Sequence, residues 1–229
     1  MSLSVDSRYC GNVYIVTGFG RIVTGEEASL LEAAMNRGLR EFNRVVLHAA
    51  EVTRVDSTGM GMLVRFLSHT RNRGGDLRLS SLQPFFRTLL QLTKLSTIFR
   101  LYDSEDEAIV SFLKEPGSVT PETSAAGPLV LFVDQSPDLC AFVRTLLHGH
   151  GYEVLSTCRV HDAKTLLSAA KVDYIVLGPD SSQMSSDTVV ATLKPLAPTA
   201  TTVLLESGFK LGDPERAGFE LLQRMQARG

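Results

Sequence analysis

The composition is that of an ordinary globular chain, and it excludes several classes of protein. The sequence has 229 residues and a formal net charge of −2, with 44% hydrophobic and 21% charged residues. This hydrophobic content excludes an intrinsically disordered protein, and at about 100–200 residues per domain the length fits one large domain or two small ones. The near-neutral charge argues against a nucleic-acid binder that works by neutralising phosphates.

The sequence also predicts where the protein works. It has no run of about 18 apolar residues, so we expect no membrane-spanning segment. Its first residues lack the basic and apolar regions of a signal peptide. The three cysteines, Cys10, Cys140 and Cys158, are odd in number and form no CxxC pair. We therefore expect reduced thiols in a cytoplasmic protein, with neither a disulfide framework nor a zinc site.

One segment divides the chain into two parts of similar length. Residues 115–127 contain two prolines and two glycines, and most of the others are small or polar. This composition is typical of a semi-extended linker. We therefore predict a first domain at residues 1–114, a linker at 115–127 and a second domain at 128–229.

In chain order, the first part alternates between strand and helix patterns. We expect strands at 12–18, 44–49, 76–80 and 100–102, and helices at 26–42, 57–71, 84–99 and 105–113. Apolar residues at helical spacing mark the helices, and short apolar runs mark the strands. Strands separated by helices need crossover connections, so neighbouring strands should be mainly parallel.

The second part continues the alternation. We expect strands at 129–133, 153–158, 174–177 and 201–205, with helices between them and a closing helix at 214–225. Ser136 and Pro137 are typical of a helix N-cap followed by its first residue. The predicted fold class is therefore α/β in two small domains, a mixed sheet with helices followed by a doubly wound parallel sheet.

The most informative residues form the segment Asp56, Ser57, Thr58, Gly59 and Met60. The segment lies where a strand gives way to a helix, and a helix N-terminus exposes unpaired N–H groups and a positive dipole end. A simple capping cluster and a binding site both remain open from the residues alone. The spacing does not fit an aspartic protease, a P-loop or a dinucleotide-binding turn.

Residues 5–114 resemble a STAS domain, and most closely the bacterial anti-sigma factor antagonists. The segments that carry the resemblance are GRIV (20–23), VVLH (45–48), DSTGMGMLV (56–64), RGGDLRL (73–79) and LYDSEDEA (101–108). The resemblance implies that Ser57 is phosphorylated, with Thr58 as second choice, and that residues 56–60 bind the partner.

The mechanism implied by the resemblance is a partner switch without catalysis by this chain. The unmodified domain would bind an anti-sigma factor serine kinase, phosphorylation of Ser57 would release it, and a Mg-dependent serine phosphatase would reverse the change. We expect no cofactor, no bound metal, no nucleic acid and no membrane, and a homodimer remains open. The alternatives are a stressosome-like scaffold and a STAS domain that binds a small ligand.

Residues 128–229 resemble a response-regulator receiver that has lost its phosphorylation chemistry. The resemblance rests on VLFVDQSPD (130–138), GYEV (151–154) and VDYIVLG (172–178). Asp134 keeps one acid of the metal pocket, Gln135 replaces the other, and Gly178 stands at the acceptor position. We expect Asp134 to cap or hold a loop, and Asp180 to be aimed away. Too few residues follow Glu206 for a further helix, strand and helix, so the domain should be truncated and serve in protein contacts.

Overall fold

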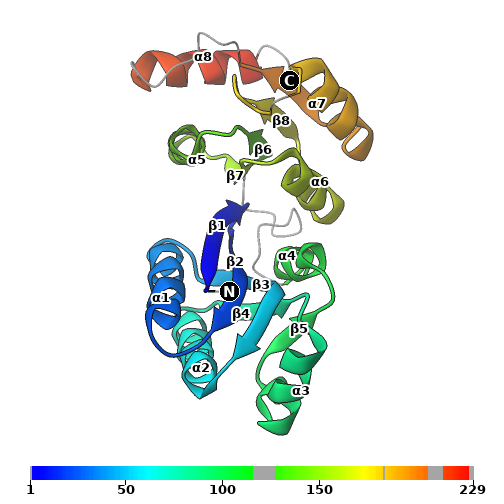
Figure 1. The fold of residues 1–229 in the computed structure, drawn as a ribbon. Coiled ribbons are helices and arrows are strands. Elements are labelled where there is room, and N and C mark those ends of the chain that lie inside the picture. Colours follow the sequence, from blue (N-terminus) through cyan, green and yellow to red (C-terminus); the bar gives the residue numbers. More distant parts are fainter. Residues whose placement is uncertain (1, 116–126, 183, 206–213, 227–229) are drawn as a thin grey trace. The chain divides into compact units, whose positions relative to one another are not determined.

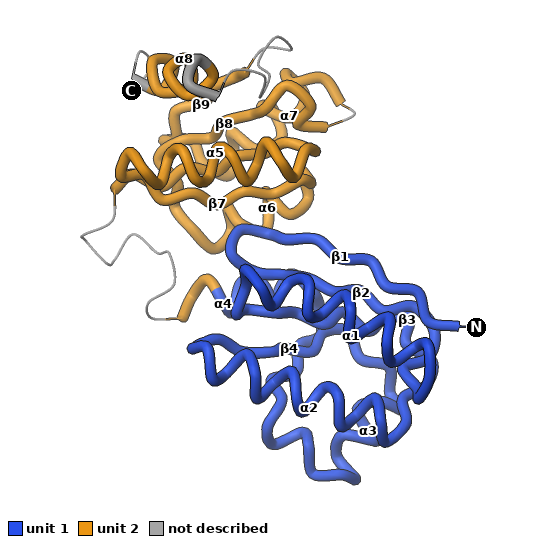
Figure 2. Tube along the Cα trace, turned by 90° about the vertical axis from the view of Figure 1, so that its left-hand side faces the viewer, with its two compact units in different colours: residues 1–112 blue, residues 113–229 orange. Residues whose placement is uncertain are grey.

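The structure is a computed structural model, and it describes residues 2–115, 127–182, 184–205 and 214–226. The chain divides into two compact units, residues 1–112 and 113–229, which Figure 2 shows in separate colours. Most of the predicted linker lies outside the described residues, so its bounds stay a prediction. Within the described residues, no helix is long and apolar enough to cross a membrane.

Unit 1 is built on a five-stranded mixed sheet with the order β5-β4-β3-β2-β1. Its strands are β1 (Ser4–Cys10), β2 (Val13–Ile22), β3 (Arg44–Val55), β4 (Asp76–Ser80) and β5 (Arg100–Tyr102). β1 pairs with β2 in antiparallel fashion, and the other neighbouring strands are parallel. The prediction of a mainly parallel sheet in this part is therefore confirmed.

Helices cover both faces of this sheet (Figure 1). They are α1 (Glu26–Leu39), α2 (Ser57–Asn72), α3 (Pro84–Leu92) and α4 (Glu105–Leu113), with a short 3-10 turn, η1 (Leu95–Thr97). On β4, Leu77 and Leu79 join the core that includes α2, whereas Arg78 points to α4 and bonds Ser111. Alternate residues of β4 thus face the helices on the two opposite sides of the sheet.

Several elements of unit 1 differ from the sequence prediction. β2 continues to Ile22 instead of ending at 18, and α1 ends at Leu39 instead of at 42. β1 was not expected, because its residues are mostly polar. The third helix ends at Leu92 instead of at 99, since Lys94 adopts a left-handed conformation with φ of 59°. β3 continues to Val55, six residues beyond the predicted end at Ala49, and therefore delivers the chain directly to the start of α2.

Unit 2 contains a parallel sheet whose described strands have the order β7-β6-β8-β9. The strands are β6 (Leu129–Val133), β7 (Glu153–Thr157), β8 (Tyr174–Leu177) and β9 (Thr201–Leu204). The helical elements are α5 (Pro137–Gly149), α6 (Val160–Ala169), α7 (Ser186–Leu193), the short η2 (Lys194–Leu196) and α8 (Pro214–Gln226). When these strands are numbered 1 to 4 along the chain, their order across the sheet is 2-1-3-4, which is the start of a doubly wound fold.

The two sides of the unit 2 sheet are both covered, with α5 and α6 on opposite faces (Figure 1). After β9, the next described element is α8. It packs against α5 at Gly218, and its Arg224 donates a hydrogen bond to the Leu204 carbonyl at 2.9 Å. Glu206, after which the truncation was predicted, lies outside the described residues. The α/β fold class with a mixed sheet in the first part is confirmed.

Candidate functional site

The end of β3 and the start of α2 meet at Asp56, which caps the helix. Asp56 has an extended backbone, and its Oδ1 accepts a hydrogen bond from the Gly59 amide at 2.9 Å. Its carbonyl accepts the Met60 amide at 2.9 Å. The first bond satisfies one of the amides that a helix N-terminus leaves unpaired, and the second is the first bond within the helix. Together they fix Ser57 as the first helical residue.

The second carboxylate oxygen of Asp56 holds the loop that follows β2. Oδ2 accepts the Thr24 amide at 2.8 Å and the Thr24 hydroxyl at 3.0 Å. The hydrogen bonds from Gly59 and Thr24 lower the pKa of Asp56 below its ordinary value. Asp56 is therefore an ionised bridge between two segments, and both its oxygens are occupied.

Ser57 and Thr58 are both exposed, but their hydroxyl groups differ in their contacts. The Thr58 hydroxyl lies 2.6 Å from the Thr24 hydroxyl, within hydrogen-bonding distance. The Ser57 hydroxyl has no hydrogen-bond partner among the residues that the structure describes. Of the two predicted phosphorylation positions, Ser57 is thus the one whose oxygen is left available.

The remaining predicted residues of the site point inward. Gly59 is buried, and a Cβ at this position would lie 2.5 Å from the Ile22 carbonyl oxygen. Met60 is 6% exposed and belongs to the core. These two residues set the helix against β2, so the structure does not bring them to the surface beside Ser57.

Two residues near Ser57 were missed by the sequence analysis. Thr24 is one, because its role depends on β2 and β3 ending side by side. Gly61 is the other. It is exposed one turn after Ser57, and nothing lies within 4 Å of where its Cβ would be. A glycine inside a predicted amphipathic helix was the available signal for it.

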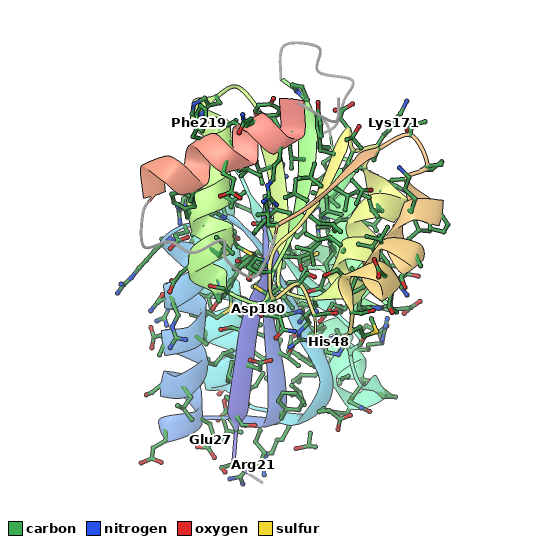
Figure 3. The ribbon with its side chains drawn as sticks, turned by 90° about the horizontal axis from the view of Figure 1, so that it is seen from above. Arg21, Glu27, His48, Lys171, Asp180 and Phe219 are labelled. Carbon is green, nitrogen blue, oxygen red and sulfur yellow. The ribbon has the colours of Figure 1, made fainter. Side chains whose placement is uncertain are left out.

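The first turn of α1 forms the neighbouring wall of the site. Arg21, near the end of β2, pairs with Glu27 of α1 at 3.1 Å (Figure 3). A surface pocket is lined by Gly25, Glu26, Ser29 and Leu30, directly after Thr24. Leu30 is 51% exposed. This pocket therefore belongs to the start of α1, and Thr24 connects it along the chain to the hydrogen bonds of Asp56.

In unit 2, Asp134 is fully buried at the end of β6. Its Oδ1 accepts the Ser136 amide at 2.8 Å, and its Oδ2 accepts the Asp180 amide at 3.0 Å. Burial raises its pKa, although these amides act in the opposite direction. The expected role of Asp134 in holding a loop is confirmed.

Gly178 faces this carboxylate, and a Cβ on Gly178 would collide with it. Asp180 is exposed and meets Asp134 through its backbone. Within the described residues, no group of three or more His, Cys, Asp or Glu side chains could hold a metal ion.

Comparisons with known proteins identify unit 1. The family model described as STAS domain matches residues 6–108. A Thermotoga maritima protein provisionally named an anti-sigma factor antagonist is 31% identical over 75 residues, which are 33% of this chain and 64% of that protein. A Thermotoga neapolitana homologue is 29% identical with the same coverage. The chain thus spans 64% of the length of these curated relatives.

A crystal structure of a Thermotoga maritima anti-sigma factor antagonist has a TM-score of 0.44 and 25% identity, covering 47% of this chain and 92% of that one. Another from Mycobacterium paratuberculosis has a TM-score of 0.43 and 22% identity, covering 48% and 93%. The residues that the family model matches include Asp56 and Ser57. Residues 6–108 of this chain therefore match the STAS domain family.

Proposed function

We propose that unit 1 is an anti-sigma factor antagonist that works by partner switching. Unmodified, it binds an anti-sigma factor serine kinase, and phosphorylation of Ser57 releases it. The observation that carries the proposal is the exposed, unengaged Ser57 hydroxyl at the first position of α2, within a STAS domain whose relatives are named for this role. A Mg-dependent serine phosphatase restores the unmodified form.

The local charges explain how one phosphate changes binding without unfolding the domain. A phosphate adds about −1.5 to −2 charge at neutral pH, and the dipole at the start of α2 tolerates it. Asp56, next to Ser57, is already ionised. A partner packed over both groups would bury two like charges together, which costs affinity.

In this proposal the chain is a substrate and a binding partner in the cytoplasm rather than an enzyme. Unit 2 acts as an interaction module that takes no phosphate itself. Support for this role comes from the Asp134 carboxylate, which backbone amides occupy, and from Gly178, which has no side chain to accept a phosphoryl group.

The test is a binding titration with each anti-sigma serine kinase encoded in the genome that carries this gene. We expect unmodified protein and Ser57→Ala to bind alike, because the lost hydroxyl is small and exposed. Phosphorylated protein should bind roughly a hundredfold more weakly, as a like-charge contact of several kcal/mol implies. Ser57→Asp should show part of this effect.

The matched control is Ser186→Asp, because Ser186 is an exposed serine at the first position of α7 in unit 2. It adds the same charge at a comparable helix start and should leave kinase binding unchanged. If the phosphorylated protein binds the kinase as tightly as the unmodified protein, the switch is wrong. If every such kinase fails to bind, the proposed function itself is wrong.

A further inference from the structure

Two neighbouring hydroxyl groups are presented at the start of α2, and both are exposed. Sequence and exposure therefore do not explain why a kinase would choose one of them. The structure distinguishes them by a single contact, since Thr58 has the Thr24 hydroxyl at 2.6 Å and Ser57 has no described partner.

We propose that Thr24 selects the phosphorylation site by holding the Thr58 hydroxyl, so that Ser57 alone is offered to the kinase. This inference rests on the proposed function and names a specificity-determining residue for it. Thr24 lies in the loop after β2, outside the helix that carries Ser57 and Thr58. It acts as a positioning residue.

The hydrogen bonds define a short chain of groups. A threonine hydroxyl has one proton, and an ionised carboxylate accepts only. The Thr24 hydroxyl therefore shares its proton between two acceptors, Asp56 Oδ2 at 3.0 Å and the Thr58 oxygen at 2.6 Å. The amide of Thr24 donates to the same carboxylate oxygen at 2.8 Å, so both the backbone and the side chain of Thr24 hold the loop to Asp56.

This arrangement handicaps Thr58 as a nucleophile. In the transfer, the serine or threonine oxygen forms a bond to the γ-phosphorus of ATP, the bond to the ADP oxygen breaks, and the hydroxyl proton leaves to the kinase or water. At Thr58 the hydroxyl oxygen accepts a hydrogen bond from Thr24, which engages an electron pair of the attacking oxygen and occupies one side of the hydroxyl. The Ser57 oxygen is free to turn toward an incoming phosphate.

The central test removes the Thr24 hydroxyl but keeps its shape and its amide. With the kinase that binds in the titration above, plus ATP and Mg²⁺, we expect wild type to gain one phosphate, located on Ser57 by fragment mass spectrometry. Ser57→Ala should gain none. Ser57→Ala combined with Thr24→Val should gain one phosphate on Thr58, at least tenfold faster than Ser57→Ala alone.

Controls separate selection from structural damage. Thr24→Ser restores the hydroxyl, so with Ser57→Ala it should remain unphosphorylated. Adding Thr58→Ala to the Val double variant should abolish the new phosphate. A measurement without kinase is the exchange of the hydroxyl proton at position 24 by NMR, which should be slow in wild type and in Thr24→Ser, and faster when Thr58→Ala removes one of its acceptors.

The outcomes distinguish the two proposals. If wild type takes no phosphate from any kinase, the proposed function fails, while the proton-exchange measurement still tests the contact. If wild type is phosphorylated on Ser57 but Ser57→Ala combined with Thr24→Val gains no phosphate on Thr58, the proposed selection by Thr24 is wrong. It is equally wrong if Ser57→Ala alone takes phosphate on Thr58 at the wild-type rate.

Discussion

At the residue scale, Asp56 determines how the site responds to pH. Its folded-state pKa lies below the ordinary value because the Gly59 and Thr24 groups donate to the ionised form. A lowered pKa means that this carboxylate stabilises the fold above the unfolded-state pKa of about 4 and ceases to do so as the pH falls through the folded value. The bridge should therefore persist throughout the neutral and mildly acidic range.

We expect the Gly59 and Thr24 amide resonances to shift together in an NMR titration, with a midpoint below pH 4. Both amides donate to this one carboxylate, so they should report one titration. Asp56→Asn should remove the shared midpoint. Separate midpoints for the two amides, or a common one above pH 4, would contradict the bridge.

The residues of the site differ in how far the sequence alone identifies them. The motif and its resemblance located Ser57, and Asp56 belonged to the segment that the sequence analysis left open as a capping cluster or a binding site. The sequence did not reveal Thr24, which lies 32 residues before Asp56 and reaches it because β2 and β3 are parallel neighbours. Contacts of this kind depend on strand register, which short-range patterns do not encode.

At the element scale, two glycines of α2 have opposite roles. Gly59 lies against the Ile22 carbonyl, whereas Gly61 has open space around it. We expect Gly59→Ala to destabilise unit 1 by about 1–3 kcal/mol through overpacking. Gly61→Ala should stabilise it by about 1 kcal/mol, because alanine is the better helix residue.

Chemical denaturation of the two variants tests this difference. Gly149→Ala, at the exposed end of α5 in unit 2, provides a control with equally open surroundings. If Gly61→Ala destabilises unit 1, then the expected gain from helix propensity is outweighed and Gly61 is needed for the fold. If Gly59→Ala leaves the free energy of unfolding of unit 1 unchanged, then α2 can shift away from β2 at little cost.

The elements themselves were predictable where apolar periodicity is strong. β4, β5, β6 and β8 have the predicted bounds, and α2 begins at the predicted residue. β1 was missed because its sequence, SVDSRYC, has little apolar alternation. The two-residue turn Gly11-Asn12 that joins it to β2 was the available hairpin signal, and Gly11 adopts the positive φ that such turns need.

At the scale of the whole molecule, unit 1 presents the exposed Ser57 hydroxyl, whereas in unit 2 backbone amides already occupy the Asp134 carboxylate. We expect the full chain, incubated with Mg²⁺ and acetyl phosphate, to show no gain in intact mass. Gly178→Asp should remain silent as well, because Asp134 fills the space that a new side chain needs. A labile phosphate that disappears in Asp180→Asn would show that unit 2 retains receiver chemistry.

The shared space of Asp134 and Gly178 also restricts which mutational paths are open to this chain. A side chain at 178 collides while Asp134 is present, and loss of Asp134 leaves the Ser136 and Asp180 amides without their acceptor. Each substitution alone passes through a less stable protein. A carboxylate at position 178 therefore needs more than one change, and a phosphate acceptor there is not a single substitution away from this sequence.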